Sequence, residues 1–260
     1  MNVLYKAWAL MTEAVVLLQP AFILQHRPYR ETSLILDLLT RDYGIVAVLA
    51  KGVRKAKSKT AGLLLPFKAL TVSYCGKADL KMLTQVELQA GATNLTGLAL
   101  YCGFYVNELV SRFLHKYDPH PEVYNDYFDC LTQLTWVMSA DQCSGSSLTP
   151  VMQLEAVLRV FELNLMQNIG LALLTQHDAY TETAIKPAAT YYFHAELGVI
   201  EHSGTGTVSG KTILAMNDKD FSDAQTLSEA KKIMRSVINF HLQGKPLKSR
   251  AVLTKIYRQF

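Results

Sequence analysis

Cysteine is scarce in this sequence, and the few thiols are far apart. The 260 residues contain only Cys75, Cys102, Cys130 and Cys143, and no two of them form a Cys-x-x-Cys pair. Small disulfide-stabilised domains and structural zinc sites both depend on closely spaced cysteines. The pattern therefore argues against a disulfide scaffold and against a structural zinc site. It is typical of the reducing cytoplasm, where we expect this protein to act.

A long uninterrupted apolar run, as a membrane-spanning helix requires, is also missing. The first candidate is the N-terminal segment, in which Lys6 precedes AWALM in the manner of a signal peptide. Thr12 and Glu13 interrupt this run, and a proline follows too soon for a span of about 18 residues. We therefore expect neither export nor a membrane partner. Met11 is an alternative to Met1 as the start of the protein.

The sequence lacks the short motifs of common hydrolases. Neither G-x-S-x-G nor H-E-x-x-H occurs, and no spacing suggests a cysteine–histidine nucleophile pair. The segment HSGTGTVSGKT is similar to a phosphate-binding loop, but Thr205 stands where that motif requires glycine. A turn in which Ser209 caps a short helix, KTILAM, is the better interpretation. We expect no enzyme, and a nucleotide-dependent activity of residues 204–212 is the weakest hypothesis.

Three histidines lie in one region with several carboxylates, which could suggest a metal site. The spacing of His177, His194 and His202 matches no familiar zinc or transition-metal pattern. Histidines of a surface hairpin are the better interpretation. We predict no metal and no cofactor, and residual metal binding by these three side chains stays an open alternative.

Charge is unevenly distributed, although the net charge is only +4. Residues 11–90 hold 11 Lys and Arg against 6 Asp and Glu, whereas residues 91–230 hold 6 against 16. Residues 231–260 hold 8 basic residues and no acidic ones. Basic ends around an acidic middle predict a polyanion-binding surface to which both ends contribute. Ordinary solvated faces are the alternative.

Five β-rich segments occupy the first third of the chain, separated by turn residues such as Gly44 and Gly76. The segments are 21–29, 31–39, 44–53, 66–75 and 79–88. Five short strands in such a stretch are typical of a small barrel of the oligonucleotide/oligosaccharide-binding (OB) type. We predict an α+β protein with an OB-type barrel at 11–92 and a mainly helical domain at 93–260.

The period of the apolar residues becomes helical after the predicted barrel. One helix is expected over 98–117, and a second begins at a turn where Asp118 can cap and Pro119 suits the first helical position. A third helix has Thr149 as its N-cap and ends at Gly170.

The rest of the chain predicts a small β insert and one last helix. Residues 177–208 lose the helical period, and YYFHAELGVIEHSG within them is typical of a hairpin. Thr226 and Glu229 form a capping box for the last helix, and Gly244 followed by a proline ends it.

The segment KGVRKAKSK, residues 51–59, is the most informative functional signal. It holds five Lys and Arg and no acid, between two strand-like segments. Binding to single-stranded nucleic acid needs a basic track for phosphates and aromatic faces for stacking. Phe67 and Tyr74, which lie on predicted strands, are interpreted as core residues. The candidate nucleic-acid-binding residues of the barrel are Arg27, Tyr29, Arg30, Tyr43, Lys51, Arg54, Lys55, Lys57 and Lys59.

Arg159 stands alone as a cation in an otherwise apolar and acidic helix, EAVLRVFELNL. Beside Leu158 and Phe161 it could receive an acidic peptide that ends in an aromatic residue. An internal ion pair with Glu155 or Glu162, at helical spacing, is an equal alternative.

Several strings, taken in order, resemble the RecO family of DNA repair proteins. They are HRPYRETSLILDLLTRDYGIVAVLAKGVRK, LLLPFKALTVSY, YVNELVSRFL, LRVFELNLMQNIG and GKPLKSR. The resemblance implies an N-terminal OB barrel and a helical C-terminal domain, often with a zinc-ribbon-like insert. It implies binding to single- and double-stranded DNA and annealing of complementary strands. It also implies partners: the acidic C-terminal tail of single-stranded DNA-binding protein, RecR and, indirectly, RecA recombinase, which is loaded onto DNA.

By position, the resemblance assigns the receipt of the acidic tail to Arg159, with Leu158 and Phe161 beside it. The string GKPLKSR adds Lys245, Lys248 and Arg250 to the DNA-binding candidates, with domain closure as their alternative role. Zinc-bearing members place four cysteines where this chain runs 171–203, and this chain has none there. The hairpin is therefore expected without a metal. A protein-interaction scaffold with incidental DNA contact is the alternative function.

Overall fold

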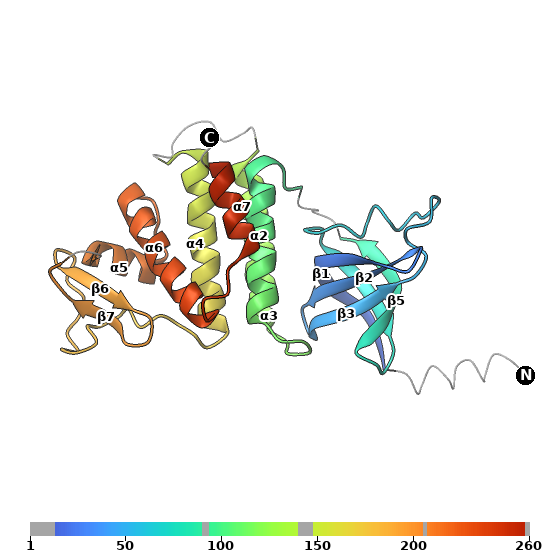
Figure 1. Ribbon diagram of the computed structural model, residues 1–260, viewed down its shortest axis with the longest axis horizontal. Helices are drawn as coiled ribbons and strands as arrows, with labels where there is room; N and C mark the ends of the chain where they lie inside the picture. The colour runs from blue at the N-terminus through green and yellow to red at the C-terminus, as the bar shows by residue number, and fades with distance from the viewer. Residues whose placement is uncertain (1–13, 90–93, 140–147, 205–206, 258–260) are drawn as a thin grey trace, which may run out of the picture. The chain divides into compact units, whose positions relative to one another are not determined.

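A computed structural model describes residues 14–89, 94–139, 148–204 and 207–257 (Figure 1). The choice between Met1 and Met11 as the start lies outside these residues. By its internal contacts, the chain divides into two compact units. Unit 1 comprises Met1–Leu95 and Asn107–Leu131, and unit 2 comprises Thr96–Val106 and Thr132–Phe260.

Unit 1 contains a closed barrel of five strands, as the sequence predicts (Figure 1). The strands are β1 (Val15–Tyr29), β2 (Ser33–Thr40), β3 (Gly44–Ala50), β4 (Leu70–Cys75) and β5 (Leu80–Leu88). They pair in the order β1-β2-β3-β5-β4, and only β3 and β5 run parallel. The predicted barrel followed by a helical region and a small separate sheet is confirmed.

Both faces of the central strands are buried, which explains their nearly continuous apolar sequence. Residues two apart, such as Leu36 and Leu38, point into the barrel core. On the other face of β1, the ring of Phe22 packs against those of Tyr124 and Tyr127, with centroids 5.3 and 4.9 Å away. Both tyrosines belong to the helix α3 (Pro121–Val137). Two hydrogen bonds support this contact: the Tyr127 hydroxyl donates to the side-chain oxygen of Asn107 at 2.6 Å, and the Asn107 side-chain amide donates to the Leu24 carbonyl of β1 at 2.7 Å.

Unit 2 is mainly helical (Figure 1). Its helices are the first part of α2 (Gly97–Phe113), the last part of α3, then α4 (Pro150–Asn168), α5 (Gly210–Asp218), α6 (Ala224–His241) and α7 (Lys248–Tyr257). Helix α4 packs against α6, and the buried residues of α4 are apolar except for Arg159 and Glu162. No helix in the described part of the chain is long and apolar enough to cross a membrane.

The predicted ends of α4 are confirmed. The Thr149 hydroxyl accepts the amide N–H of Met152, and Pro150 occupies the first helical turn. Beyond the last turn, Gly170 has φ +78°, the left-handed conformation that glycine adopts without strain.

Helix α3 begins two residues later than predicted, at Pro121 and not at Pro119. The helix begins at Pro121, whereas Asp118 and Pro119 lie before it. The reason is steric, because a residue that precedes proline is disfavoured in the helical region. His120 precedes Pro121, so the helix can begin only at the second proline.

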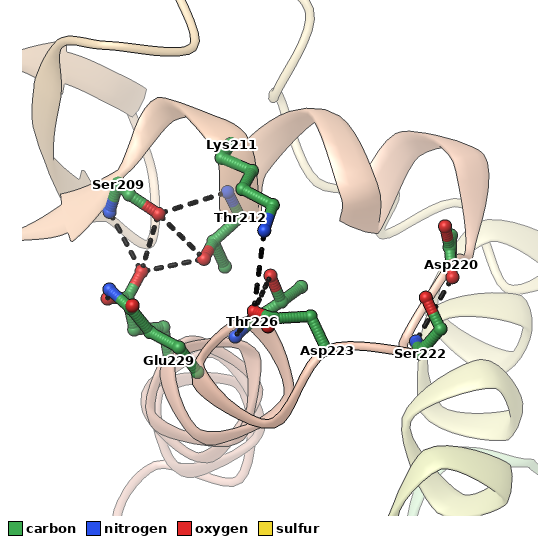
Figure 2. Close-up of polar contacts among 9 residues, drawn as sticks. Ser209, Lys211, Thr212, Asp220, Ser222, Asp223, Thr226 and Glu229 are labelled. Carbon is green, nitrogen blue, oxygen red and sulfur yellow. Dashed lines mark hydrogen bonds and ion pairs between the residues drawn. The ribbon is translucent and has the colours of Figure 1, made fainter. Parts of the chain in front are cut away.

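The predicted capping box of the last helix is also wrong. Asp223 is the N-cap of α6, and its carboxylate accepts the amide N–H of Thr226 at 2.9 Å. Glu229 instead accepts the Ser209 amide N–H at 2.8 Å and the Thr212 hydroxyl at 2.6 Å (Figure 2). Glu229 thus ties α6 to the beginning of α5. The prediction that Ser209 caps this helix is confirmed, because its hydroxyl accepts the Thr212 N–H.

The predicted last helix, α6, is followed by one further helix that the sequence analysis did not predict. Gly244 has φ +73° and terminates α6, and the helix α7 then begins at Lys248. The glycine and the proline that follows mark a turn between two helices. The sequence KSRAVLTKIY has no acidic residue in the first turn of α7, so a familiar start signal is missing.

The β insert forms a three-stranded sheet of order β7-β6-β8. Its strands are β6 (Thr190–His194), β7 (Gly198–Glu201) and β8 (Val208–Ser209), and the predicted hairpin is the antiparallel pair of β6 and β7. Asp178 lies at the edge of this sheet. Its carboxylate accepts the amide N–H groups of Tyr180 and Thr181 at 3.0 and 2.8 Å, and also that of Glu201.

Candidate nucleic-acid interface and peptide pocket

A groove of about 710 Å³ lies on unit 1 where β1 turns into β2 and where β3 runs into the basic segment. Its lining includes four of the candidate DNA-binding residues, Tyr29, Arg30, Lys51 and Lys55. The remaining lining residues are Glu31, Thr32, Ser33, Leu49 and Gly52. Strand pairing explains this convergence, because Leu34 of β2 lies opposite Ala50 of β3. The β1–β2 turn and the basic segment therefore emerge at the same end of the barrel.

The basic segment is fixed to the β1–β2 turn where it begins. The amide N–H of Arg54 donates to the Thr32 carbonyl at 2.8 Å, and its guanidinium donates to the Arg30 carbonyl at 3.3 Å. Gly52 has φ +70°, which lets the chain leave β3 in a tight turn. Arg54 thus holds the groove together, while the cations beside it line the open space.

Arg30 and Tyr29 form a cation–aromatic pair at the groove. The guanidinium carbon of Arg30 lies 5.3 Å from the centroid of the Tyr29 ring. Arg30 is exposed and has φ +49°, a left-handed conformation uncommon for a residue with a side chain. An aromatic ring beside three cations, Arg30, Lys51 and Lys55, suits a base and its phosphate.

The other barrel candidates do not line this groove. Arg27, Lys57 and Lys59 are exposed, on β1 and farther along the basic segment. Tyr43 follows β2, at the opposite end of the β2–β3 ladder, and its ring meets that of Tyr74 edge-on at 6.3 Å. The interpretation of Phe67 and Tyr74 as core residues is confirmed, since they are 4% and 2% exposed.

A second cavity lies within unit 2 and encloses about 80 Å³. It is lined by Tyr105 of α2, by Glu155, Leu158, Arg159 and Glu162 of α4, by Lys231 and Arg235 of α6, and by Arg250, Leu253 and Thr254 of α7. The cations come from three helices, and α4 lies far from α6 and α7 in the sequence. We refer to this cavity as the cationic pocket.

The two interpretations of Arg159 both describe part of what the structure contains. Arg159 is 6% exposed and forms an ion pair with Glu162, as the internal alternative predicts. It also lines the cationic pocket together with Leu158, as the peptide hypothesis requires. Phe161 does not line the pocket, because its ring is 2% exposed and belongs to the buried face of α4.

Arg250 lies in the cationic pocket, although the sequence grouped it with the DNA-binding candidates. Its guanidinium donates to the side chain of Asn239 at 2.6 Å and lies 5.9 Å from the centroid of the Tyr105 ring. Lys245 and Lys248 are exposed and do not line this pocket. The three residues of GKPLKSR therefore lie in two different environments.

The sequence analysis did not predict two residues of the cationic pocket, Lys231 and Arg235 of α6. Lys231 forms an ion pair with Glu155 of α4, whereas no acidic partner of Arg235 occurs among the residues described here. Their spacing of four places both on one face of the helix, and this was the available signal. The sequence of α6 alone does not indicate that this face packs against α4.

A buried network forms the floor of the cationic pocket. The Tyr105 hydroxyl donates to Glu162 Oε1 at 2.6 Å, and the Arg159 guanidinium pairs with the same oxygen. Burial, together with the negative charge of Glu162, raises the pKa of Tyr105 well above its ordinary value. Burial acts to lower the pKa of Arg159, but attraction by Glu162 outweighs it and the pKa is raised. Arg159 therefore stays charged in the interior.

The three histidines of the β insert do not converge. The His194 ring nitrogen Nδ1 accepts the amide N–H groups of Glu196 and Leu197, both at 3.3 Å, so this histidine organises the β6–β7 turn. Within the described ranges, no group of three or more His, Cys, Asp or Glu side chains is arranged to hold a metal ion.

The fold and the two sites together define a class, an OB-type barrel with a cationic groove joined to a helical region that has its own cationic pocket. Comparison with known proteins specifies the family. Residues 12–92 match the family model "Recombination protein O N terminal", and residues 95–251 match "Recombination protein O C terminal". The chain belongs to the RecO family, whose members are DNA-binding proteins of repair and recombination and not enzymes.

Curated relatives are similar over most of their length. The DNA repair protein RecO of Thiobacillus denitrificans is 38% identical over 253 residues, which cover 96% of this chain and 96% of the relative. That of Methylococcus capsulatus is 39% identical over 236 residues, 90% and 92% of the two chains. That of Burkholderia pseudomallei is 38% identical over 240 residues, 90% and 82% of the two chains.

Proposed function

We propose that this protein binds single- and double-stranded DNA through the groove of its barrel and anneals complementary strands. The groove is the observation that carries the proposal, because it places Arg30, Lys51 and Lys55 beside an aromatic ring in one open space. Phosphate neutralisation supplies affinity without sequence preference, and stacking on Tyr29 suits an unpaired base.

Annealing by this route needs no active site. Two strands repel each other through their phosphates, and cations that neutralise one strand lower the barrier to its partner. Weak, sequence-tolerant stacking lets the strands shift until the register matches.

The cationic pocket is proposed to receive the acidic C-terminal tail of single-stranded DNA-binding protein. Arg235 and Arg250 would attract carboxylates at the rim, and Leu158 and Leu253 offer apolar surface for a terminal aromatic side chain. With RecR, the protein would then help to load RecA onto DNA in the cytoplasm. A protein-interaction scaffold is the second candidate, and the pocket is the feature that favours it.

The salt dependence of DNA binding tests the groove directly. The double variant Lys51→Ala/Lys55→Ala should bind a single-stranded oligonucleotide more weakly and reduce the slope of log affinity against log salt by about 1.4 units. The control is Lys68→Ala/Lys77→Ala, which removes the same charge from residues that do not line the groove. Fluorescence anisotropy at several salt concentrations measures both. An unchanged slope in the first variant, or equal changes in the two, would contradict the proposal.

A further inference from the structure

The cationic pocket holds one buried donor and one buried acceptor that lack partners. Nε of Arg159 and Oε2 of Glu162 have no hydrogen-bond partner in the part of the chain that the structure describes. Both side chains line the cavity. Glu162 Oε1 is already engaged by Tyr105 and by the Arg159 guanidinium, so only its second oxygen is available. An unpaired polar group in an interior of low dielectric is unfavourable, and a ligand that pairs it gains affinity.

The ligand that completes this pocket must offer an acceptor and a donor close together. Arg159 requires an oxygen, preferably an ionised one, and Glu162 requires an N–H or O–H group. A phosphodiester offers only acceptors, and its negative charge would approach the Glu162 carboxylate. The last residue of a peptide offers both, because its α-carboxylate adjoins its own amide N–H.

Selectivity matters here because the rim alone does not provide it. Arg235 and Arg250 would attract the phosphates of DNA as readily as the carboxylates of a peptide. The other acid of the pocket, Glu155, is already paired with Lys231. Glu162 is therefore the acid that can distinguish the two kinds of anion.

We propose that Glu162 is a specificity-determining residue of the cationic pocket: it accepts the main-chain N–H of a peptide's C-terminal residue, while Arg159 binds the adjacent carboxylate. Phosphodiesters, which have no hydrogen to donate, are rejected by the same side chain. This inference rests on the peptide-binding function proposed above and adds to it which chemistry the pocket admits.

A displacement assay tests the proposed selectivity. The probe is a fluorescein-labelled acidic peptide that ends in phenylalanine with a free carboxylate, and the competitor is diethyl phosphate, a phosphodiester without an O–H group. The measured quantity is the ratio of the diethyl phosphate inhibition constant to the peptide dissociation constant. Glu162→Gln should lower this ratio by about tenfold or more, because it removes the repulsion of phosphate and weakens the acceptor.

Glu155→Gln is the matched control, since it removes the same charge from the same pocket. We expect it to change the affinities for peptide and phosphate in the same direction, so that their ratio shifts by about threefold at most. Equal falls of the ratio in the two variants would overturn the proposal, because the effect would then belong to net charge alone.

Ester analogues of the peptide test the hydrogen bond in the unaltered protein, whether or not Glu162→Gln folds. Replacing the last amide by an ester removes the proposed donor, and binding should weaken about tenfold or more. An ester one residue earlier is the control and should have a smaller effect. If the protein binds the ordinary peptide but binds both ester analogues equally well, the role of Glu162 is overturned and the peptide-binding function is not. A protein that does not bind the ordinary peptide would overturn the peptide-binding function itself.

Discussion

Two tyrosines of the barrel provide a matched test of stacking. Tyr29 lines the groove beneath Arg30, whereas Tyr43 packs edge-on against Tyr74 at the opposite end of the β2–β3 ladder. Tyr29→Ala should weaken the binding of an oligothymidine by about 1–3 kcal/mol, the usual contribution of one base–aromatic stack. Tyr43→Ala should leave it unchanged. Titration at one fixed salt concentration measures both, and equal losses would show that bases do not stack at the groove.

Asp178 is the residue through which the β insert should become sensitive to acid. Hydrogen bonds donated to its carboxylate by Thr181, Glu201 and Tyr180 lower its pKa from 3.8 to about 2. Because the folded-state pKa is depressed, this contribution is fully present above about pH 4. It is lost as the pH falls through the range from 4 to 2.

Replacing Asp178 should remove this acid sensitivity along with part of the stability. Asp178→Asn is expected to lower the free energy of unfolding of the insert by about 1–3 kcal/mol at neutral pH, since the amide nitrogen cannot accept an N–H. Hydrogen exchange at the Glu201 amide, followed from pH 6 to about pH 2, measures the effect. The exposed Asp129→Asn is the control. Protection at Glu201 that is equal in parent and Asp178→Asn would contradict this role.

At the scale of a single element, α6 presents two cationic residues, three positions apart, that differ in their surroundings. Arg235 lines the cationic pocket, whereas Lys232 is exposed on the same helix and does not line it. Arg235→Ala should weaken the binding of an acidic, phenylalanine-terminated peptide about five- to tenfold, because a charge-assisted contact is lost. Lys232→Ala should change the affinity by less than about twofold, as expected of an exposed, screened charge that does not line the pocket. Fluorescence titration decides, and equal effects would place the peptide elsewhere.

The number and order of the barrel strands were predictable because their signal is local, although β1 begins at Val15 and β4 at Leu70, six residues before and four residues after their predicted starts. Alternation and turn residues place β2 and β5 within about two residues of where they lie. The capping of α6 was not predictable in the same way. The partner of Glu229 is Ser209, 20 residues earlier in the chain, and the alternative partner Thr226 satisfies the local capping pattern equally well.

The candidate sites show the same division between local and distant information. Tyr29, Arg30, Lys51 and Lys55 come together because β1, β2 and β3 are consecutive antiparallel strands, so residues that flank the turns share one end. The cationic pocket joins α4 to α6 and α7 across many intervening residues. The packing of the helices against one another determines that arrangement, and it cannot be predicted from the periodicity of any single helix.

At the scale of the whole molecule, the groove belongs to unit 1 and the cationic pocket to unit 2. A recombination mediator needs both sites, whereas a protein-interaction scaffold needs only the pocket. The two functions should therefore be separable by substitution. Lys51→Ala/Lys55→Ala should lower DNA affinity with an unchanged affinity for the acidic peptide, and Arg235→Ala should do the opposite.

Strand annealing distinguishes the mediator from the scaffold. If the protein is a mediator, annealing of complementary oligonucleotides should slow in the Lys51→Ala/Lys55→Ala variant in proportion to its lost DNA affinity, because annealing depends on phosphate neutralisation. The Arg235→Ala variant should anneal bare strands at the parent rate. Once the strands are coated with single-stranded DNA-binding protein, the same variant should fall behind the parent. A parent protein that does not accelerate annealing of bare strands would favour the scaffold, because the groove would then bind DNA without bringing two strands together.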